Sequence, residues 1–259
     1  MKIYRFRYRK KVLTGVLKEE FLFPIVGSVF GDFRIGTSPV PIGDVRILPP
    51  VLPSKIIGIG RNYKEHAAEL GNPLPEEPLV FLKPPSAVIG HLDTVVQPPS
   101  SRRVDYEGEV GVVIRRKARN LRDDDPVEAV ILGYTCFNDV TARDLQTKDV
   151  QFTRAKGFDT FAAVGPCVAT GLDPAGLRLK TFLNGRLVQS GTTSNLIFSI
   201  PHLVRFLSRI MTLLPGDIIA TGTPAGVGPT SPGDRVDVQI DGIGVLSNMF
   251  TRPSAKEDS

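Results

Sequence analysis

Apolar residues occur in short runs that end at Gly, Pro, Asn or Asp, a pattern typical of a chain rich in β-strands. The two runs on either side of Asn184-Gly185 predict a hairpin with a two-residue turn, which is the sharpest local signal in the chain. The runs that predict strands are residues 55–60, 104–114, 130–137, 179–183, 186–189, 218–220 and 236–240.

Helical patterns are few. Apolar residues at helical spacing after Ser199 and Pro201 predict a helix, and its buried face is expected to be Leu203, Phe206, Leu207 and Ile210. Because strands dominate and no repeated strand–helix–strand rhythm occurs, the sequence predicts an α+β fold with a mixed sheet.

Two further helices are predicted from capping signals. Asn62 and Glu65 form a capping box for a helix and loop over residues 61–78. Thr141 and Asp144 give a similar signal for a helix that ends near residue 148.

The chain is expected to contain a small and a large domain. The Pro-rich stretch 49–53 separates a β-rich N-terminal domain, residues 1–52, from the main domain, residues 53–259. In the small domain, Arg5–Lys11 alternates basic and aromatic residues, which favours a half-solvated strand over a phosphate-binding patch.

Composition narrows the class of protein. The net charge is +5, but basic residues are scattered and no nucleic-acid motif accompanies them, so nucleic acid is not an expected partner. A mildly basic surface attracts small di-acids instead. No run is long enough to span a membrane and no signal peptide is expected. Cys136 and Cys167 lie in apolar runs and are expected to be buried free thiols, which suggests a cytoplasmic protein.

The acidic residues of the run at 104–114 are the first candidates for chemistry. Glu107 and Glu109 are two apart on a predicted strand, so their carboxylates share a face with that of Asp105, and Gly108 keeps the other face free of bulk. They form either a solvated strand face, paired with Arg102 or Arg103, or one side of a cation site.

Asp139 is the candidate that completes a cation site. It follows a buried-looking strand and precedes a predicted helix, so it is either a helix cap or a third ligand beside Glu107 and Glu109. Three carboxylates without His or Cys suit Mg²⁺, Mn²⁺ or Ca²⁺ and argue against zinc.

Three further features have both a functional and an ordinary interpretation. His66 and Glu69 share a helical face, as a water-activating base and its partner would, or they are a surface pair. The Gly-rich turn 221–228 lacks the features of a nucleotide-binding loop but could hold a carboxylate. Lys156, in a weakly polar loop, is either a substrate clamp or a surface lysine.

Taken together, the chain resembles the fumarylacetoacetate hydrolase family in its short bacterial and archaeal form. The resemblance covers roughly residues 55–250, and its motifs occur in the family's order. These motifs are Gly60-Arg-Asn-Tyr63 with His66 and Glu69, Phe81-Leu-Lys-Pro84, Tyr106-Glu-Gly-Glu109, Asn138–Gln146, Lys156-Gly-Phe-Asp159, Gly165-Pro166, Asn184-Gly185, Phe198-Ser-Ile-Pro201, Gly216-Asp217 and Thr221–Gly228.

The resemblance implies a fold, a metal and a set of site residues. It implies a mixed β-roll with a wound sheet, a homodimer, and Mg²⁺ or Mn²⁺ on Glu107, Glu109 and Asp139. It further implies that Lys156, Gln146 and Thr223 contact the substrate, that Arg61 lies near the mouth of the site, and that His66 and Glu69 act from a mobile lid.

The function expected from these residues is chemistry on a 2-oxo acid through a metal-bound enolate. The first expectation is C–C hydrolysis of a β-diketone of the acylpyruvate or fumarylpyruvate type, as in aromatic catabolism. The alternatives are isomerisation of 2-hydroxyhepta-2,4-diene-1,7-dioate and decarboxylation of 5-oxopent-3-ene-1,2,5-tricarboxylate or of oxaloacetate. Sequence alone leaves open which group leaves C3.

Overall fold

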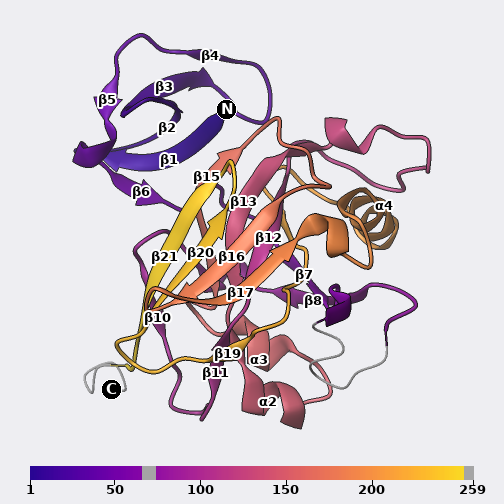
Figure 1. Ribbon diagram of the computed structural model, residues 1–259. Coiled ribbons are helices and arrows are strands. Elements are labelled where there is room, and N and C mark those ends of the chain that lie inside the picture. Colours follow the sequence, from indigo (N-terminus) through magenta and orange to yellow (C-terminus); the bar gives the residue numbers. More distant parts are fainter. Residues whose placement is uncertain (66–73, 254–259) are drawn as a thin grey trace.

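The computed structural model of the chain describes residues 1–65 and 74–253 and is built mainly from strands. Figure 1 shows the N-terminal strands at one end, long strands in the middle, and helices α2 (Arg143–Lys148) and α3 (Thr153–Gly157) at the other end. The β-rich α+β fold predicted from the sequence is confirmed.

A sheet of 13 strands forms the centre of the molecule. Its strands are β1 (Lys2–Tyr8), β2 (Lys11–Lys18), β3 (Phe21–Gly27), β4 (Phe33–Ile35), β5 (Val40–Pro41), β6 (Arg46–Leu48), β7 (Ile56–Gly60), β8 (Leu79–Lys83), β9 (Val88–Ile89), β12 (Gly108–Ile114), β13 (Ile131–Asp139), β15 (Ala162–Ala169) and β18 (Ile218–Ala220). The main order is β4-β3-β2-β1-β15-β13-β12-β18-β7-β8. The sheet is mixed, because β18 and β7 are parallel whereas β12 and β13 are antiparallel.

Two smaller sheets and several helical turns complete the fold. The five-stranded sheet contains β10 (Thr94–Val96), β21 (Gly244–Thr251), β20 (Arg235–Ile240), β16 (Arg178–Leu183) and β17 (Arg186–Thr192). The three-stranded sheet contains β14 (Thr141–Ala142), β11 (Val104–Tyr106) and β19 (Gly228–Pro229). The 3₁₀ turns are η1 (Ile42–Asp44), η2 (Pro85–Ala87), η3 (Val127–Ala129) and η4 (Thr193–Asn195).

The hairpin predicted at Asn184-Gly185 is confirmed as β16–β17. Both turn residues have positive φ, 51° at Asn184 and 81° at Gly185, as a two-residue hairpin turn with right-handed strand twist requires. This hairpin packs β16 against the central strand β12, and the two strands overlap in the view of Figure 1.

Helix α4 (Ile200–Ile210) confirms the predicted helix, whereas part of its predicted core face is wrong. Ser199 caps it by accepting from the His202 N–H. Leu203 and Leu207 are buried as expected, together with Val204, but Phe206 is only partly buried. Ile210 ends the helix and is 54% exposed, because α4 presents the side centred on Val204 to the core.

The capping signal at α2 was misread, although the helix ends at Lys148 as predicted, and the helix predicted after Asn62 lies mainly outside the described residues. Asn62 is buried and bridges two loops, accepting from Phe198 N and donating to Thr221 O, each at 2.8 Å. At α2 no side chain caps the first turn, and Asp144 instead accepts from the Ser101 hydroxyl and the Arg102 N–H. In both cases a partner distant in sequence uses the capping side chain.

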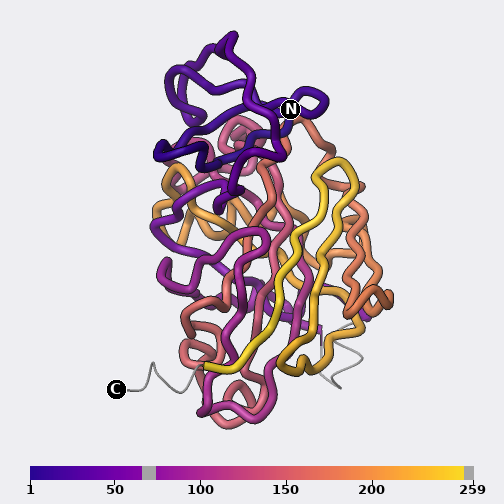
Figure 2. The backbone as a smooth tube through the Cα atoms, turned by 90° about the vertical axis from the view of Figure 1, so that its left-hand side faces the viewer, coloured from indigo at the N-terminus to yellow at the C-terminus, as the bar shows by residue number. Residues whose placement is uncertain are grey.

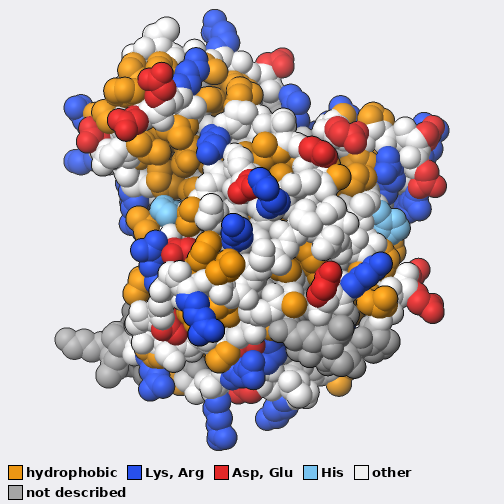
Figure 3. All heavy atoms as spheres, in the orientation of Figure 1, with side chains coloured by type: hydrophobic (Ala, Val, Ile, Leu, Met, Phe, Trp, Pro, Cys, Tyr) orange, Lys and Arg blue, Asp and Glu red, His pale blue; other side chains and the backbone are white. Residues whose placement is uncertain are grey.

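The N-terminal strands and the cysteines agree with their predictions. In β1, Tyr4 and Phe6 are buried while Arg7 is exposed, so the basic arm is a half-solvated strand. Figure 2 shows these strands stacked on the end of the main body, and Figure 3 shows Lys and Arg side chains scattered over the visible face. Cys136 and Cys167 are buried free thiols, and burial raises the pKa of Cys167 to about 11. Within residues 1–65 and 74–253, no helix is long and apolar enough to cross a membrane.

Candidate active site

The strand predicted over residues 104–114 is interrupted at Glu107, and the interruption forms the site. The residues before it belong to β11 in the small sheet, and those after it belong to β12 in the large sheet. Glu107 N donates to Asn138 Oδ1 at 3.0 Å, and Asp139 N donates to Glu107 O at 2.8 Å. The chain therefore passes from one sheet to the other beside the end of β13.

This crossing brings three carboxylates together. Glu107, Glu109 and Asp139 are all buried, and each offers an oxygen within 4.8 Å of the others. Glu109 follows Gly108 at the start of β12, while Asp139 is the last residue of β13, which pairs with β12. The arrangement agrees with the predicted triad.

Asp105 was expected on the same face and is not part of the cluster. It lies in β11, and its carboxylate pairs with Arg103 and Arg143, each at 2.9 Å. The strand break at Glu107 explains the difference, because the period-two rule holds only within one continuous strand.

The cluster is electrostatically unfavourable without a nearby cation. The pKa of Glu109 is raised well above its ordinary value, first by burial and then by the charges of Asp139 and Glu107. The Gly222 N–H opposes this shift by donating to Glu109 Oε2 at 2.8 Å. The Gly-rich turn predicted as a carboxylate cradle thus holds a carboxylate of the protein itself.

Lys156 is a buried site residue, not a surface lysine in a loop. It belongs to α3, and its Nζ donates to Glu107 Oε2 at 2.8 Å and to Asp139 Oδ2 at 2.6 Å. Burial disfavours its ammonium form, yet the carboxylates of Asp139 and Glu107 outweigh burial and raise its pKa. Lys156 is therefore protonated at neutral pH.

Lys83 and Arg143 are charged residues of the site whose roles the sequence did not indicate. Lys83 in β8 is fully buried and donates to Asp139 Oδ1 and to Val140 O, and burial lowers its pKa to about 8. Arg143 bridges Asp105 and Glu107 and also donates to Gln146 Oε1. Both residues lie inside the family motifs, so their place in those motifs could have identified them as site residues.

A cavity of about 450 Å³ opens onto the carboxylates. Its lining contains every expected substrate residue that the structure describes, namely Arg61, Gln146, Lys156 and Thr223, with aromatic walls from Phe81 and Phe152. The lining is Ile59, Gly60, Arg61, Leu79, Phe81, Glu107, Glu109, Asp139, Arg143, Gln146, Thr147, Phe152, Lys156 and Thr223.

Arg61 and Thr223 are fixed in different ways. Arg61 follows β7 with a φ of 56°, an uncommon conformation for a residue other than glycine and one that often marks a functional position. The Thr223 hydroxyl donates to Gly108 O and accepts from Gln189 Nε2, both at 2.8 Å. The Thr223 hydroxyl proton is therefore in a hydrogen bond to the Gly108 carbonyl and is not donated to a ligand.

The donor set fits the hard divalent ions that the sequence predicted. Carboxylate oxygens suit Mg²⁺, Mn²⁺ or Ca²⁺, and Glu107, Glu109 and Asp139 are the one group of three or more potential ligands found among the described residues. A dication next to Glu109 would relieve the repulsion that raises its pKa.

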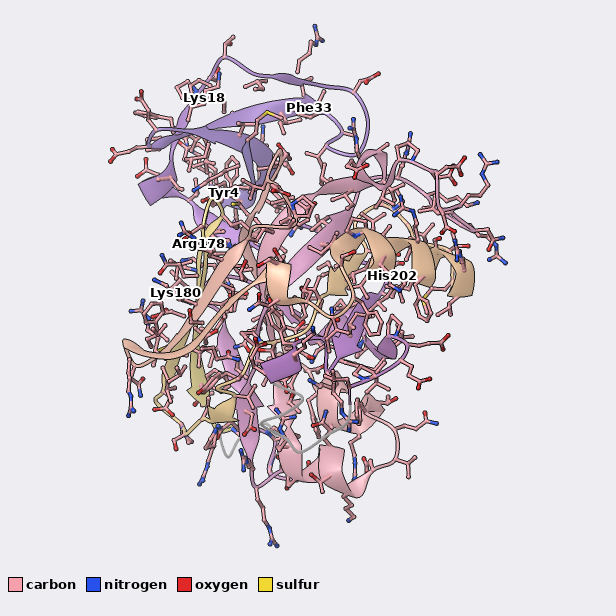
Figure 4. The ribbon with its side chains drawn as sticks, turned by 45° about the vertical axis from the view of Figure 1, so that its right-hand side comes forward. Tyr4, Lys18, Phe33, Arg178, Lys180 and His202 are labelled. Atoms are coloured by element: carbon pink, nitrogen blue, oxygen red, sulfur yellow. The ribbon has the colours of Figure 1, made fainter. Side chains whose placement is uncertain are left out.

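The predicted His66–Glu69 dyad lies outside the described residues. His202 is on α4 and stacks with Phe198 and Phe206, at ring distances of 5.5 Å and 6.1 Å. Figure 4 shows it at the side of the molecule, away from α2 and α3. His91 accepts from Ser247 N at 3.1 Å and does not line the cavity.

Comparison with known proteins places the chain among enzymes. Residues 55–251 match the family model described as Fumarylacetoacetate (FAA) hydrolase C-terminal, and residues 1–50 match the model described as Rv2993c-like, N-terminal. An uncharacterized protein of Archaeoglobus fulgidus is 57% identical over 82% of this chain and 85% of its own length.

The relatives with functional names include a tautomerase and an isomerase. The oxaloacetate tautomerase YisK of Bacillus subtilis is 44% identical over 83% of this chain and 77% of its own length. The solved structure of 5-carboxymethyl-2-hydroxymuconate delta-isomerase from Mycobacterium smegmatis is 40% identical with a TM-score of 0.91, covering 98% of this chain and all of its own. The chain therefore belongs to the fumarylacetoacetate hydrolase family of enzymes, as its motifs indicate.

Proposed function

We propose that this enzyme transfers a proton between carbon and oxygen of a small 2-oxo dicarboxylic acid, as a tautomerase or isomerase does. One observation carries the proposal: the three buried carboxylates lie beside the Lys156 ammonium, on the wall of a cavity that Arg61 and Arg143 also line. The names of the Bacillus tautomerase and the Mycobacterium isomerase support it.

Glu107, Glu109 and Asp139 are the residues that would hold a divalent ion. Bound Mg²⁺ or Mn²⁺ would supply a Lewis acid that polarises the 2-oxo group and favours its enolate. Removal of any one carboxylate is expected to weaken the ion's binding and the activity together.

Lys156 is the group of the chain best placed to stabilise negative charge on a substrate oxygen. Its Nζ carries three N–H donors, of which Glu107 and Asp139 accept two, so one remains for a ligand in the cavity that Lys156 lines. Because Lys156 is protonated at neutral pH, it first acts as a hydrogen-bond donor and proton source to the substrate oxygen, and the neutral amine so formed is the base that can accept the proton leaving C3.

The charge of the cavity favours a di-acid. A volume of about 450 Å³ has room for a short one, and guanidinium groups can bind carboxylates with two hydrogen bonds. We infer that Arg61 meets the distal carboxylate, while Gln146 and Lys156 meet the 2-oxo end. We infer that the apolar Phe81 and Phe152 walls limit the access of water to the reacting carbon.

Hydrolysis of an acylpyruvate is the second candidate. It would use the same ion and the same Lys156, but it also needs a water molecule and a base to activate it. The spacing of His66 and Glu69 in the sequence favours it, since an imidazole beside a carboxylate is a suitable base.

One assay series separates the two reactions. Oxaloacetate and related 2-oxo di-acids are incubated with Mg²⁺ or Mn²⁺ in D₂O, and deuterium at C3 is followed by NMR, while acylpyruvates are tested for release of pyruvate. Exchange without cleavage is the expected result. Cleavage of acylpyruvates with no exchange on any di-acid would replace the proposal by the hydrolase, and inactivity in both assays would refute both.

A further inference from the structure

Gln189 of β17 is a buried amide that reaches the metal-binding strand without lining the cavity. Its Oε1 accepts from Gly108 N at 3.0 Å, and its Nε2 donates to Thr223 Oγ1 at 2.8 Å and to Pro224 O at 2.9 Å. The Thr223 hydroxyl in turn donates to Gly108 O at 2.8 Å. These contacts close a ring around Gly108, the residue between the two glutamate ligands.

The ring holds the peptide groups on both sides of Gly108. β18 pairs with residues 111–113 of β12, so Gly108 lies beyond the end of that pairing. Its N–H belongs to the peptide that follows Glu107, and its C=O belongs to the peptide that precedes Glu109. Holding both groups therefore fixes the rotation of the two backbone segments that carry the ligands.

Gly108 depends on this support because glycine has the greatest backbone freedom of any residue. A side chain could not restrict it, since a β-carbon at this position would lie 2.1 Å from the buried Thr181 hydroxyl. Thr181 and Gln189 face each other across the β16–β17 hairpin, so the same hairpin excludes a side chain and supplies the amide.

We propose that Gln189 is a positioning residue, which sets the spacing of the Glu107 and Glu109 carboxylates by holding Gly108. The inference rests on the proposed function in that the site binds a divalent ion and a 2-oxo acid. Loss of Gln189 is expected to have its larger effect on ion affinity and its smaller effect on substrate affinity, because the groups that Gln189 orients are the ligands for the ion.

The test compares Gln189→Met with Gln239→Met. Gln239 lies on β20 of the same sheet, half-buried and away from the cavity, so it is a matched control. Mg²⁺ affinity is measured by calorimetry, KM with a 2-oxo di-acid, and stability by thermal unfolding. We expect Gln189→Met to weaken Mg²⁺ at least about fivefold and to raise KM, with no change in Gln239→Met. A loss of thermal stability with unchanged Mg²⁺ affinity and KM would show that Gln189 is structural only.

A second pair of variants covers the case in which Gln189→Met does not fold. Thr223→Val opens the ring at another point and should also weaken Mg²⁺ binding, whereas Thr223→Ser keeps the hydroxyl and should restore it. Wild-type Mg²⁺ affinity in Thr223→Val would overturn the inference. Failure of the proposed function is distinguishable, because the wild-type protein would then bind no Mg²⁺ or turn over no 2-oxo acid.

Discussion

At the scale of single residues, opposite charges occupy the interior of this site in close contact. Lys83 and Lys156 each hold one oxygen of Asp139, and Arg143 holds Glu107. Burial of a charge is unfavourable unless a partner compensates it. Removal of one charged residue therefore leaves a buried charge without its partner. Glu109 is held by the Gly222 N–H, a weaker partner than a full cation, which makes it the carboxylate with most to gain from a metal ion.

The first prediction concerns the metal ligands. Glu107→Ala, Glu109→Ala and Asp139→Ala should each weaken Mg²⁺ binding by at least about tenfold, because each removes one of three hard oxygen ligands. EDTA should abolish wild-type activity, and added Mg²⁺ should restore it. Calorimetric titration measures the affinity, and Asp241→Asn, a surface carboxylate paired with Arg178, is the control. Wild-type affinity in all three alanine variants would refute the site.

The second prediction concerns Lys156 and gives two effects of opposite sign. Lys156→Met removes a cation that lies 2.6 Å from Asp139 and 2.8 Å from Glu107, so Mg²⁺ should bind more tightly. Turnover should fall by roughly 10²–10⁴-fold, because the substrate oxygen loses its proton donor. Calorimetry and the exchange assay measure the two effects. Weaker Mg²⁺ binding with retained turnover would contradict the assigned role.

At the scale of elements, the site depends on how closely the β16–β17 hairpin packs on β12. At Gly108 the Thr181 side chain of the hairpin occupies the space that a side chain on β12 would need. The Gly-rich turn makes a similar approach at Gly226, whose φ is 98° and where a β-carbon would lie 2.0 Å from Val188 O. Glycine is required at Gly108 by space, and at Gly226 by space and backbone conformation.

The third prediction follows from that packing. Gly108→Ala should lower the free energy of unfolding by about 1–3 kcal/mol, the usual result of overpacking, and should weaken Mg²⁺ binding. Adding Thr181→Ala removes the hydroxyl and leaves a Thr181 β-carbon 3.4 Å away, so the double variant should recover part of both losses. Gly31→Ala is the control, because nothing lies within 4 Å of its added methyl group. Denaturant unfolding provides the measurement, and absence of any recovery would contradict the proposed contact.

At the scale of the whole molecule, the first fifty residues share their sheet and their core with the rest. β1 pairs with β15 through Lys2 and Ile3, and the N-terminal amine donates to Thr170 O at 3.1 Å. Tyr4, Phe6 and Leu22 belong to the same apolar cluster as the central strands. Figure 2 shows this part directly continuous with the body of the molecule.

The fourth prediction is that residues 1–50 cannot be removed without loss of stability. Their deletion takes Tyr4 and Phe6 out of a shared core, and each large buried side chain contributes about 3–5 kcal/mol. The full chain should unfold in one cooperative transition, and the shortened chain should melt at least about 10 °C lower or precipitate. A soluble shortened chain with an unchanged melting temperature would indicate two independent domains.

The expected homodimer also stays a prediction, which light scattering can test.

The sequence by itself determined the features that depend on residues close to one another along the chain. The Asn184-Gly185 turn and the Ser199 cap of α4 follow from local backbone geometry, and the structure agrees with both. The carboxylates of Glu107 and Glu109 do converge, but they do so across the break between β11 and β12 and not along one strand. The family motifs added Asp139 and Lys156, which local rules alone left with two interpretations.

Only the tertiary structure decided which polar side chains meet. Lys83, Asp139 and Lys156 come from three different elements, and Gln189 reaches Gly108 across 81 positions of the chain. Asp105, Asn62 and Asp144 had plausible local roles, but each also has a partner distant in sequence. The physical reason is that a buried polar group bonds to the best partner that packing brings near it, and sequence spacing carries no information on which partner that is.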